Sequence, residues 1–412
     1  MTLDVAAVKA DFPMLATQID GKPIVYLDSA ATSQKPNAVI DAMDDYYRNA
    51  YASVNRGAYK IAAAATDLLE DARSSVARFI NAPNDHEVIF TKNATESFNL
   101  FVQSWGRANL GPGDAVVITE MEHHANIVPW HMLREQLGFE LRWIPITDTG
   151  ELDLTDLDTL LDGAKVLAAT AMSNVLGTLN PIRRLADAAH AAGAIMLADG
   201  SQFVPHLPTD VQELGVDAFI FTGHKMLGPT GVGVFWATSE LLEAMPPFLG
   251  GGDMILQVTK EGFTPNVLPH KFEAGTPNIA EIIGLGAAVK YLEGLGMDAV
   301  REHEVSLTGY AMRLLKERFG DGIKIQGPSE PAARGGVLSV EYKDVHPHDI
   351  SQVLDQDNVY VRAGHHCAKP LMAVLGVHAT ARASMYVYND EADVDAFADA
   401  LEKSDDIFGL GI

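Results

Sequence analysis

Residues 194–225, AIMLADGSQFVPHLPTDVQELGVDAFIFTGHK, contain two short apolar runs, and polar residues follow each run. The runs span 194–198 and 218–222, and Asp199 and Lys225 lie just beyond them. Similar runs occur at 87–91, 115–119, 140–145 and 166–172, with helical patterns between most of them, such as 182–192. Continuous apolar runs are typical of strands buried on both faces, and their alternation with helices indicates βαβ units. The sequence therefore predicts an α/β fold with a mostly parallel sheet.

The pattern changes after a helical segment at 282–295. Strands are predicted at 336–342, 359–362 and 381–388, and helices at 348–354 and near the C-terminus, where apolar residues recur at helical spacing. This part is typical of a smaller α+β domain. We expect a large domain over 21–285 and a small domain over 286–412, which carries the Cys367 loop. Residues 1–20 are expected to pack with the small domain.

Composition excludes several classes of protein. The 412 residues include 55 acidic and 30 basic side chains, so the net charge is −25, which disfavours nucleic acid and membrane surfaces as partners. The chain has one cysteine and so can form no internal disulfide. An apolar run of about 18 residues, as a membrane helix needs, is absent, and the first residues do not resemble a signal peptide. We expect a cytoplasmic protein.

Polar side chains follow five of the predicted strands, where open α/β sheets bind their ligands. They are Asn93, Thr95, Glu96, Glu122, His123, His124, Asn126, Asn174, Asp199, Ser201, Gln202, Thr222, His224 and Lys225. Core packing alone does not explain so many polar groups at equivalent positions. The sequence therefore predicts a ligand site at the carboxyl edge of the sheet.

Two common kinds of site fit poorly. Gly231-Val232-Gly233 begins like a dinucleotide-binding fingerprint, but Trp236 occupies the third glycine position and an apolar run follows. His365, His366 and Cys367 are metal-ligand types, but neighbouring residues in an extended segment point to opposite sides. We therefore expect no metal.

A pyridoxal phosphate site fits better. This cofactor needs a lysine for a Schiff base, a carboxylate for the pyridine nitrogen and a phosphate cradle. Lys225 and Asp199 follow neighbouring strands and could meet one cofactor from two sides. Thr95, at a predicted helix N-terminus, could bind the phosphate together with Thr222 and His224.

Several motifs extend this interpretation along the chain. They are Tyr26-Leu-Asp-Ser-Ala-Ala, Asn93-Ala-Thr-Glu, Glu122-His-His-Ala-Asn, Asp199-Gly-Ser-Gln, Thr222-Gly-His-Lys-Met-Leu-Gly-Pro-Thr-Gly and Arg362-Ala-Gly-His-His-Cys-Ala. With these motifs the chain resembles the class V, fold-type I pyridoxal-phosphate enzymes, and within them the SufS-type (group II) cysteine desulfurases. The resemblance implies the PLP-dependent transferase fold type I with a seven-stranded sheet, and it implies a homodimer.

The resemblance also implies a role for each matching residue. Lys225, His123 and Cys367 would be catalytic, with Cys367 accepting the sulfur of L-cysteine as a persulfide. The cofactor would be held by Lys225, Asp199, Gln202, His123, Ala94, Thr95, Thr222 and His224, with Thr276 reaching over from a second subunit. The substrate would be bound by Arg382, Asn174, Arg362, Asn55 and Arg56. The sulfur would pass to a SufU- or SufE-type acceptor for iron–sulfur cluster assembly.

Other functions stay open on the sequence alone. A selenocysteine lyase would use the same site, whereas a cysteine-independent lyase or aminotransferase of this family would not need Cys367. A non-enzymatic scaffold is disfavoured because Lys225, Asp199 and Cys367 are all present. Asn55 stands where relatives commonly have histidine, so any acid–base role there is lost or moved. Direct functions of His124, His365 and His366 are also open.

Overall fold

Seven strands form one sheet within residues 3–55 and 57–409, which the computed structural model describes. Their order is β4 (Val88–Thr91), β10 (Gly233–Ala237), β9 (Ala218–Thr222), β8 (Ile195–Asp199), β7 (Ala164–Thr170), β5 (Ala115–Thr119) and β6 (Glu140–Ile144). The pairs from β9 through β6 are parallel, and β10 runs antiparallel to both of its neighbours. The predicted α/β fold with a mostly parallel seven-stranded sheet is confirmed.

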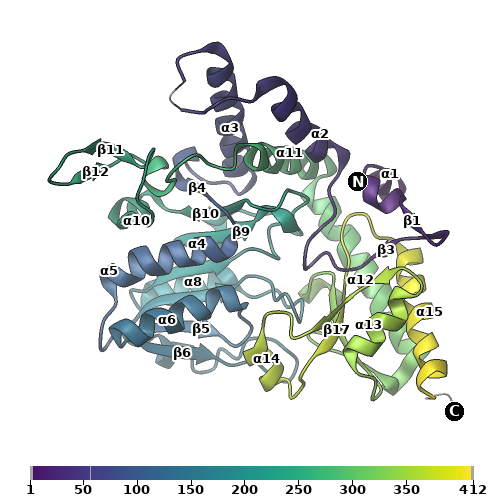
Figure 1. The fold of residues 1–412 in the computed structure, drawn as a ribbon. Helices are drawn as coiled ribbons and strands as arrows, with labels where there is room; N and C mark the ends of the chain where they lie inside the picture. Colours follow the sequence, from purple (N-terminus) through teal and green to yellow (C-terminus); the bar gives the residue numbers. More distant parts are fainter. Residues whose placement is uncertain (1–2, 56, 410–412) are drawn as a thin grey trace.

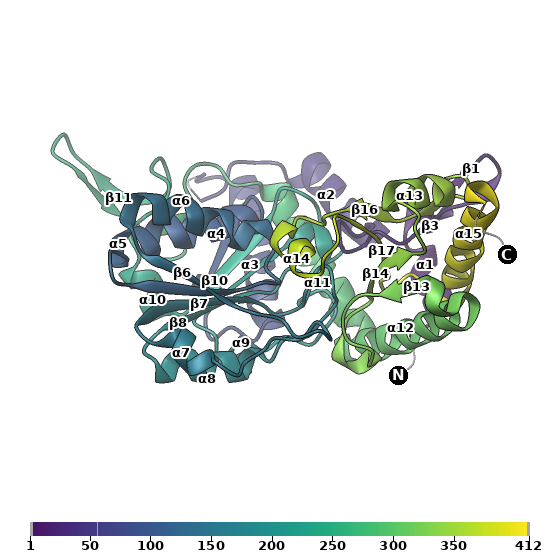
Figure 2. The same cartoon turned by 90° about the horizontal axis from the view of Figure 1, so that it is seen from below.

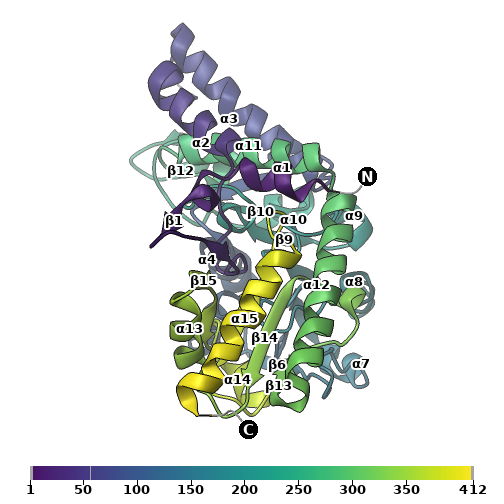
Figure 3. The ribbon, with the colours of Figure 1, turned by 90° about the vertical axis from the view of Figure 1, so that its right-hand side faces the viewer.

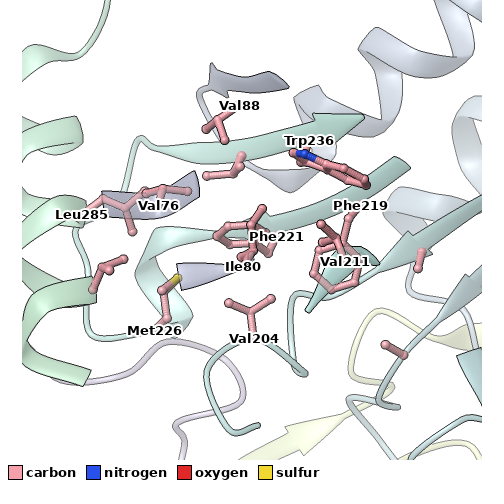
Figure 4. Packing of buried hydrophobic residues seen from close by; sticks show 14 of the residues in the cluster. Val76, Ile80, Val88, Val204, Val211, Phe219, Phe221, Met226, Trp236 and Leu285 are labelled. Atoms are coloured by element: carbon pink, nitrogen blue, oxygen red, sulfur yellow. The ribbon is translucent and has the colours of Figure 1, made fainter. Parts of the chain in front are cut away.

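Helices cover both faces of this sheet, as Figure 2 shows. One face packs against α4 (Ala94–Phe101) and α6 (Val128–Leu137). The other packs against α3 (Lys60–Phe79), α7 (Leu157–Leu161), α8 (Ile182–Ala191), α9 (Val211–Leu214) and α11 (Ile279–Leu295). Neighbouring strand residues alternate between the two cores; Phe219 and Phe221 belong to one and Ile220 to the other. Figure 4 shows Phe219 and Phe221 packed among Val76, Val204, Met226 and Leu285. Apolar burial on both faces explains why these strands read as continuous apolar runs.

Strand β10, which follows the Lys225 loop, is not among the strands predicted from the sequence. It begins at Gly233, in the apolar run noted after Gly231-Val232-Gly233, and it runs antiparallel to both of its neighbours. Gly233 pairs with Thr91 of β4 on one side and with Thr222 of β9 on the other. A Cβ atom on Gly233 would lie 2.4 Å from the backbone of Asn93. The glycine therefore allows β10 to approach the start of α4.

A second, smaller sheet has the order β13 (Ile323–Ile325), β14 (Val337–Tyr342), β17 (Thr380–Ser384) and β16 (Arg362–Gly364). Its core includes apolar residues of α12 (Met297–Phe319), α13 (Pro347–Asp355) and α15 (Glu391–Phe408). Figure 3 shows these helices grouped around the small sheet. We call this part the small domain and the part built on the seven-stranded sheet the large domain. The short helix α14 (Lys369–Val374) lies between the two in Figure 2.

The structure differs from both predicted limits of the large domain, residue 21 and residue 285. Helix α11 crosses the boundary predicted at 285 and packs throughout its length with the large-domain core, so the chain leaves that domain near Gly296. Strand β3 (Val25–Tyr26), predicted within the large domain, pairs in parallel with β15 (Val359–Tyr360) of the small domain. Of the predicted N-terminal segment, Lys9 binds Asp393 of α15, whereas Phe12 packs against Tyr291 of α11.

The remaining elements lie mostly at the periphery, as Figure 1 shows. They are α1 (Val5–Ala10), β1 (Gln18–Ile19), β2 (Lys22–Pro23), α2 (Asn37–Asp45), α5 (Arg107–Asn109), α10 (Ser239–Ala244), β11 (Ile255–Val258) and β12 (Phe263–Pro265). The hairpin of β11 and β12 projects from the large domain (Figure 1). Among the residues that the structure describes, no helix is both long and apolar enough to cross a membrane.

Candidate functional site

A cavity of about 220 Å³ lies where the carboxyl ends of the large-domain strands meet the small domain. Most of the predicted site residues line it: Ala94, Thr95, His123, Asn174, Asp199, Gln202, Thr222, His224, Lys225, Arg362, Cys367 and Arg382. They come from segments that are far apart in sequence. The structure therefore brings the predicted catalytic, cofactor-binding and substrate-binding groups together in one place.

Two of the predicted residues do not line this cavity, and a third lies outside the described part of the chain. Thr276 is exposed and lines a separate hollow beside Lys92 and Glu96. Asn55 is exposed and has a positive φ of 69°, and its backbone N–H binds Thr66 Oγ1. Arg56 lies outside the described residues.

Asp199, which is buried, and Lys225, which is partly buried, are the acid and the base that face the centre of the cavity. Asp199 ends β8, is 5% exposed, and accepts a hydrogen bond of 2.9 Å from the backbone N–H of Ser201. Burial raises the pKa of Asp199, while the bonds from Ser201 oppose the shift. Burial also lowers the pKa of Lys225 to about 8, against the attraction of Asp199. The lysine can therefore lose its proton much closer to neutral pH than a lysine in water.

The start of α4 offers groups that could bind a phosphate. The Asn93 side chain caps this helix by accepting from Glu96 N at 2.9 Å, and Ala94 and Thr95 face the cavity. The N-terminus of a helix favours an anion because its backbone N–H groups and its dipole point toward the ligand. Burial lowers the pKa of His224, which also lines the cavity, to about 4, so its imidazole is neutral at pH 7.

The chemistry of these donors fits pyridoxal phosphate. Gln202 donates from Nε2 to the carbonyl of Ala30 at 2.7 Å, while its buried Oε1 has no hydrogen-bond partner among the described residues. An unpartnered buried amide oxygen is costly, and a hydroxyl of a bound ligand would satisfy it. With Asp199 and Lys225 also facing the cavity, each polar part of this cofactor has a suitable group. These residues would hold it.

Arg382 is the buried cation on the small-domain side. It is 2% exposed, donates to the carbonyl of Asn174 at 2.9 Å, and forms an ion pair with Asp28 at 3.3 Å. Its Nε has no partner in the part of the chain that the structure describes. Guanidinium groups of this kind bind carboxylates with defined geometry, so Arg382 is suited to an amino acid substrate.

The Cys367 loop joins β16 to α14 and enters the cavity from the small domain. Both His366 and Cys367 have positive φ angles, 50° and 55°, a conformation that is uncommon for residues other than glycine. Asn174 donates to the carbonyl of His366 at 2.7 Å, and the His366 ring is hydrogen-bonded to Thr380. The thiol is half-buried. Contacts on both sides thus hold the loop in a strained shape.

His123 lies on the wall formed by the segment after β5. Its Nδ1 accepts from Ala125 N at 3.1 Å, which places the ring proton on Nε2. Burial, reinforced by Lys225, lowers its pKa to about 3, so the ring is neutral at pH 7. The adjacent Glu122 is fully buried, binds Thr119, Asn126 and Thr170 N, and has a pKa raised by burial to about 8.

Sequence reasoning gave no role to some residues that shape this site. Asp28 and Ala30 belong to the quoted Tyr26 motif, yet only the structure shows that they contact Arg382 and Gln202. Their partners lie hundreds of residues away, so no local pattern reveals the contacts. Thr170, Met172 and Ser201 also line the cavity. Ser201 follows a predicted strand, whereas Thr170 and Met172 lie at the end of the strand predicted at 166–172.

Comparisons with known proteins agree with this geometry. The aminotransferase class-V family matches residues 25–397. A probable cysteine desulfurase from Streptomyces coelicolor is 49% identical, over 99% of this chain and 98% of the relative. The crystal structure of the Escherichia coli cysteine desulfurase CsdA is 38% identical with a TM-score of 0.91, covering 99% of this chain and 100% of the other. A cysteine desulfurase from Thermococcus onnurineus is 36% identical with a TM-score of 0.93, and 98% of each chain is covered. The chain therefore belongs to the aminotransferase class-V family and, within it, to the cysteine desulfurases, which depend on pyridoxal phosphate.

Proposed function

We propose that this protein converts L-cysteine to L-alanine and keeps the sulfur on Cys367 as a persulfide. One observation carries the proposal: the half-buried thiol of Cys367 lines the same cavity as Lys225, Asp199 and Arg382. A cysteine that served only as a small apolar residue would be expected among apolar side chains and not in such a polar cavity.

The residues divide the work by their chemistry. Arg382 would bind the substrate carboxylate, with Asn174 and Arg362 beside it. Pyridoxal phosphate, once bound, supplies a sink for the electron pair that the substrate's Cα releases. Lys225, with its pKa near 8, would take the Cα proton and later return it. His123 would move a proton at Nε2.

The sulfur step requires a nucleophile, and Cys367 would provide it as a thiolate. Its Sγ would form a bond to the substrate's sulfur while the substrate's Cβ–S bond breaks. The electron pair of that bond stays with Cβ, which gains a proton to become the methyl group of alanine. One cysteine and one thiol thus give one alanine and one persulfide, and no external oxidant or reductant is needed.

The finer parts of the proposal follow from the resemblance. We place the protein in the SufS-type group, as a homodimer acting in the cytoplasm and passing sulfur to a SufU- or SufE-type acceptor for iron–sulfur cluster assembly. Two observations support the dimer. Thr276 lies exposed outside the cavity of its own chain, where a second subunit could use it. The projecting hairpin exposes Leu256, Val258 and Phe263, which a partner could cover.

The proposal predicts that alanine formation depends on Cys367. Purified holoenzyme is incubated with L-cysteine and a thiol reductant as sulfur acceptor, and alanine is measured for wild type, Cys367→Ser and Cys367→Ala. We expect sustained alanine formation by wild type and background levels for both variants, because neither side chain can accept sulfur. Retained cofactor absorbance in the variants shows that their sites are intact. Wild-type activity in either variant would contradict the proposal and indicate a cysteine-independent lyase or aminotransferase.

A further inference from the structure

His124 connects the large domain directly to the Cys367 loop. Its backbone N–H donates to the carbonyl of Cys367 at 2.8 Å, and its imidazole Nε2 accepts from the backbone N–H of Lys369 at 3.0 Å. Both partners are main-chain groups, one within the loop and one at the start of α14. Because an amide N–H only donates, Nε2 must be unprotonated for the second bond to exist.

The loop needs this support because its own conformation is unfavourable. His366 and Cys367 both adopt left-handed backbone conformations, which persist only where surrounding contacts hold them. Asn174 holds the carbonyl of His366 on the cavity side. His124 contacts the carbonyl of Cys367 and the N–H of Lys369, so Asn174 holds the main chain just before Cys367 and His124 holds it just after.

Cys367 and His124 also line a second space outside the main cavity. A hollow of about 240 Å³, mostly apolar, is lined by Thr95, Asn99, His123, His124, Ala125, Val128, Pro129, Met132 and Cys367. Cys367 therefore borders both this hollow and the main cavity. If the hydrogen bonds between His124 and the loop were lost, the thiol could turn from the main cavity toward the second hollow.

We propose that His124 is a positioning residue that fixes the Cys367 loop so that the thiol faces the substrate. This rests on the proposed role of Cys367 as the sulfur acceptor. His124 touches neither substrate nor cofactor in this role. It acts through the two main-chain hydrogen bonds, and only the imidazole bond depends on its side chain.

The hydrogen bond from the Lys369 N–H to His124 Nε2 should be sensitive to acid. Protonation would place an N–H on Nε2, facing the N–H of Lys369, and the attraction would become repulsion. Burial lowers the pKa of His124, and the neighbouring charges of His365 and Lys369 lower it further. The His123 ring also lies 6.2 Å away. The hollow's other lining residues on α4 and α6 carry no ionisable groups, so the bond should persist at neutral pH and be lost on acidification.

The test compares two replacements of His124 in the holoenzyme. The amide oxygen of His124→Gln can accept the bond and does not titrate, whereas His124→Leu can accept nothing. His131→Gln is the matched control, since His131 lies on α6 and is not part of the hollow. Cys367 is the only cysteine, so iodoacetamide labelling reports on its loop alone. The second readout is kcat and KM for alanine formation between about pH 5 and pH 8.

We expect His124→Leu to label about two- to tenfold faster and to lose kcat by a similar factor, as the loss of one hydrogen bond implies. KM should change less, because the substrate carboxylate site is untouched. His124→Gln should label like wild type and should lose less activity than wild type on acidification. His131→Gln should match wild type in both.

Wild-type labelling of His124→Leu, or a His124→Gln enzyme with the same acid loss as wild type, would overturn the proposal. If His124→Leu does not fold, the pH profile of His124→Gln alone still tests the proposal. Failure of the proposed function gives a different result: Cys367→Ser would stay active, while the labelling rates would still show whether His124 holds the loop.

Discussion

One carbonyl oxygen, that of His224, illustrates how single residues set the geometry of this site. Among the described residues it accepts from Ser33 N at 3.0 Å, Thr32 Oγ1 at 3.1 Å, Ser33 Oγ at 3.1 Å and Lys35 Nζ at 3.0 Å. Ser33 Oγ also accepts from Leu227 N at 2.9 Å, and Leu227 has a positive φ of 65°. The segment 32–35 thus fixes the backbone on both sides of Lys225.

Lys35 should give stability a measurable pH dependence. Burial lowers its pKa from 10.5 to about 7, so between these values the unfolded chain binds more protons than the folded one. Stability from this residue therefore rises as the pH rises from about 7 to 10.5. In urea unfolding, the difference in free energy between wild type and Lys35→Met should grow in favour of wild type over this range. A difference that is independent of pH would contradict the assignment.

At the scale of elements, β10 and the start of α4 approach closely, and we propose that the cofactor's phosphate binds at the start of α4. Gly233 of β10 lies between Thr91 and Thr222 and against the backbone of Asn93, which caps α4. Backbone cannot move aside as a flexible side chain can. Because Gly233 has no side chain, β10 can pair with β9 and still lie against the start of α4, and this sets the distance between β9 and α4.

Gly233→Ala should weaken cofactor binding. The added methyl group forces the backbone of Asn93 to shift, and overpacking of this kind costs about 1–3 kcal/mol. If this cost falls on the start of α4, the dissociation constant for pyridoxal phosphate rises about 5- to 150-fold. Fluorescence titration of the apoenzyme with the cofactor measures this. Gly250→Ala, where a Cβ would meet nothing within 4 Å, is the control and should bind like wild type. Equal affinity in both variants would contradict the account.

Much of the architecture could be predicted from sequence because the central strands are buried on both faces. The predicted strand 218–222 has the bounds of β9, and at least one polar residue at the end of each of β4, β5, β7, β8 and β9 lines one cavity. The strand predicted at 381–388 ends at Ser384, since Tyr386 and Tyr388 leave the sheet to pack in the large-domain core. The missed strand β10 and the contacts of Asp28 depend on partners distant in sequence, which no local pattern reports.

At the scale of the whole molecule, the site exists only where the two domains meet. The large domain supplies Asp199 and Lys225, and the small domain supplies Arg382 and Cys367. Asn174 and His124 cross this boundary to hold the Cys367 loop. The buried pair of His206 and Glu304, 2.9 Å apart, links the domains again at a distance from the site. Domain packing therefore brings Cys367 and Arg382 to the edge of the large sheet that carries Asp199 and Lys225.

The most direct test of the central claim is the mass of the protein after one turnover. Holoenzyme is mixed with L-cysteine without any acceptor, quenched, and measured intact and after proteolysis. The account predicts a gain of one sulfur atom on the peptide containing Cys367, in equal amount to the alanine formed, and its removal by a thiol reductant. Alanine formed in that amount with Cys367 unmodified would contradict the account.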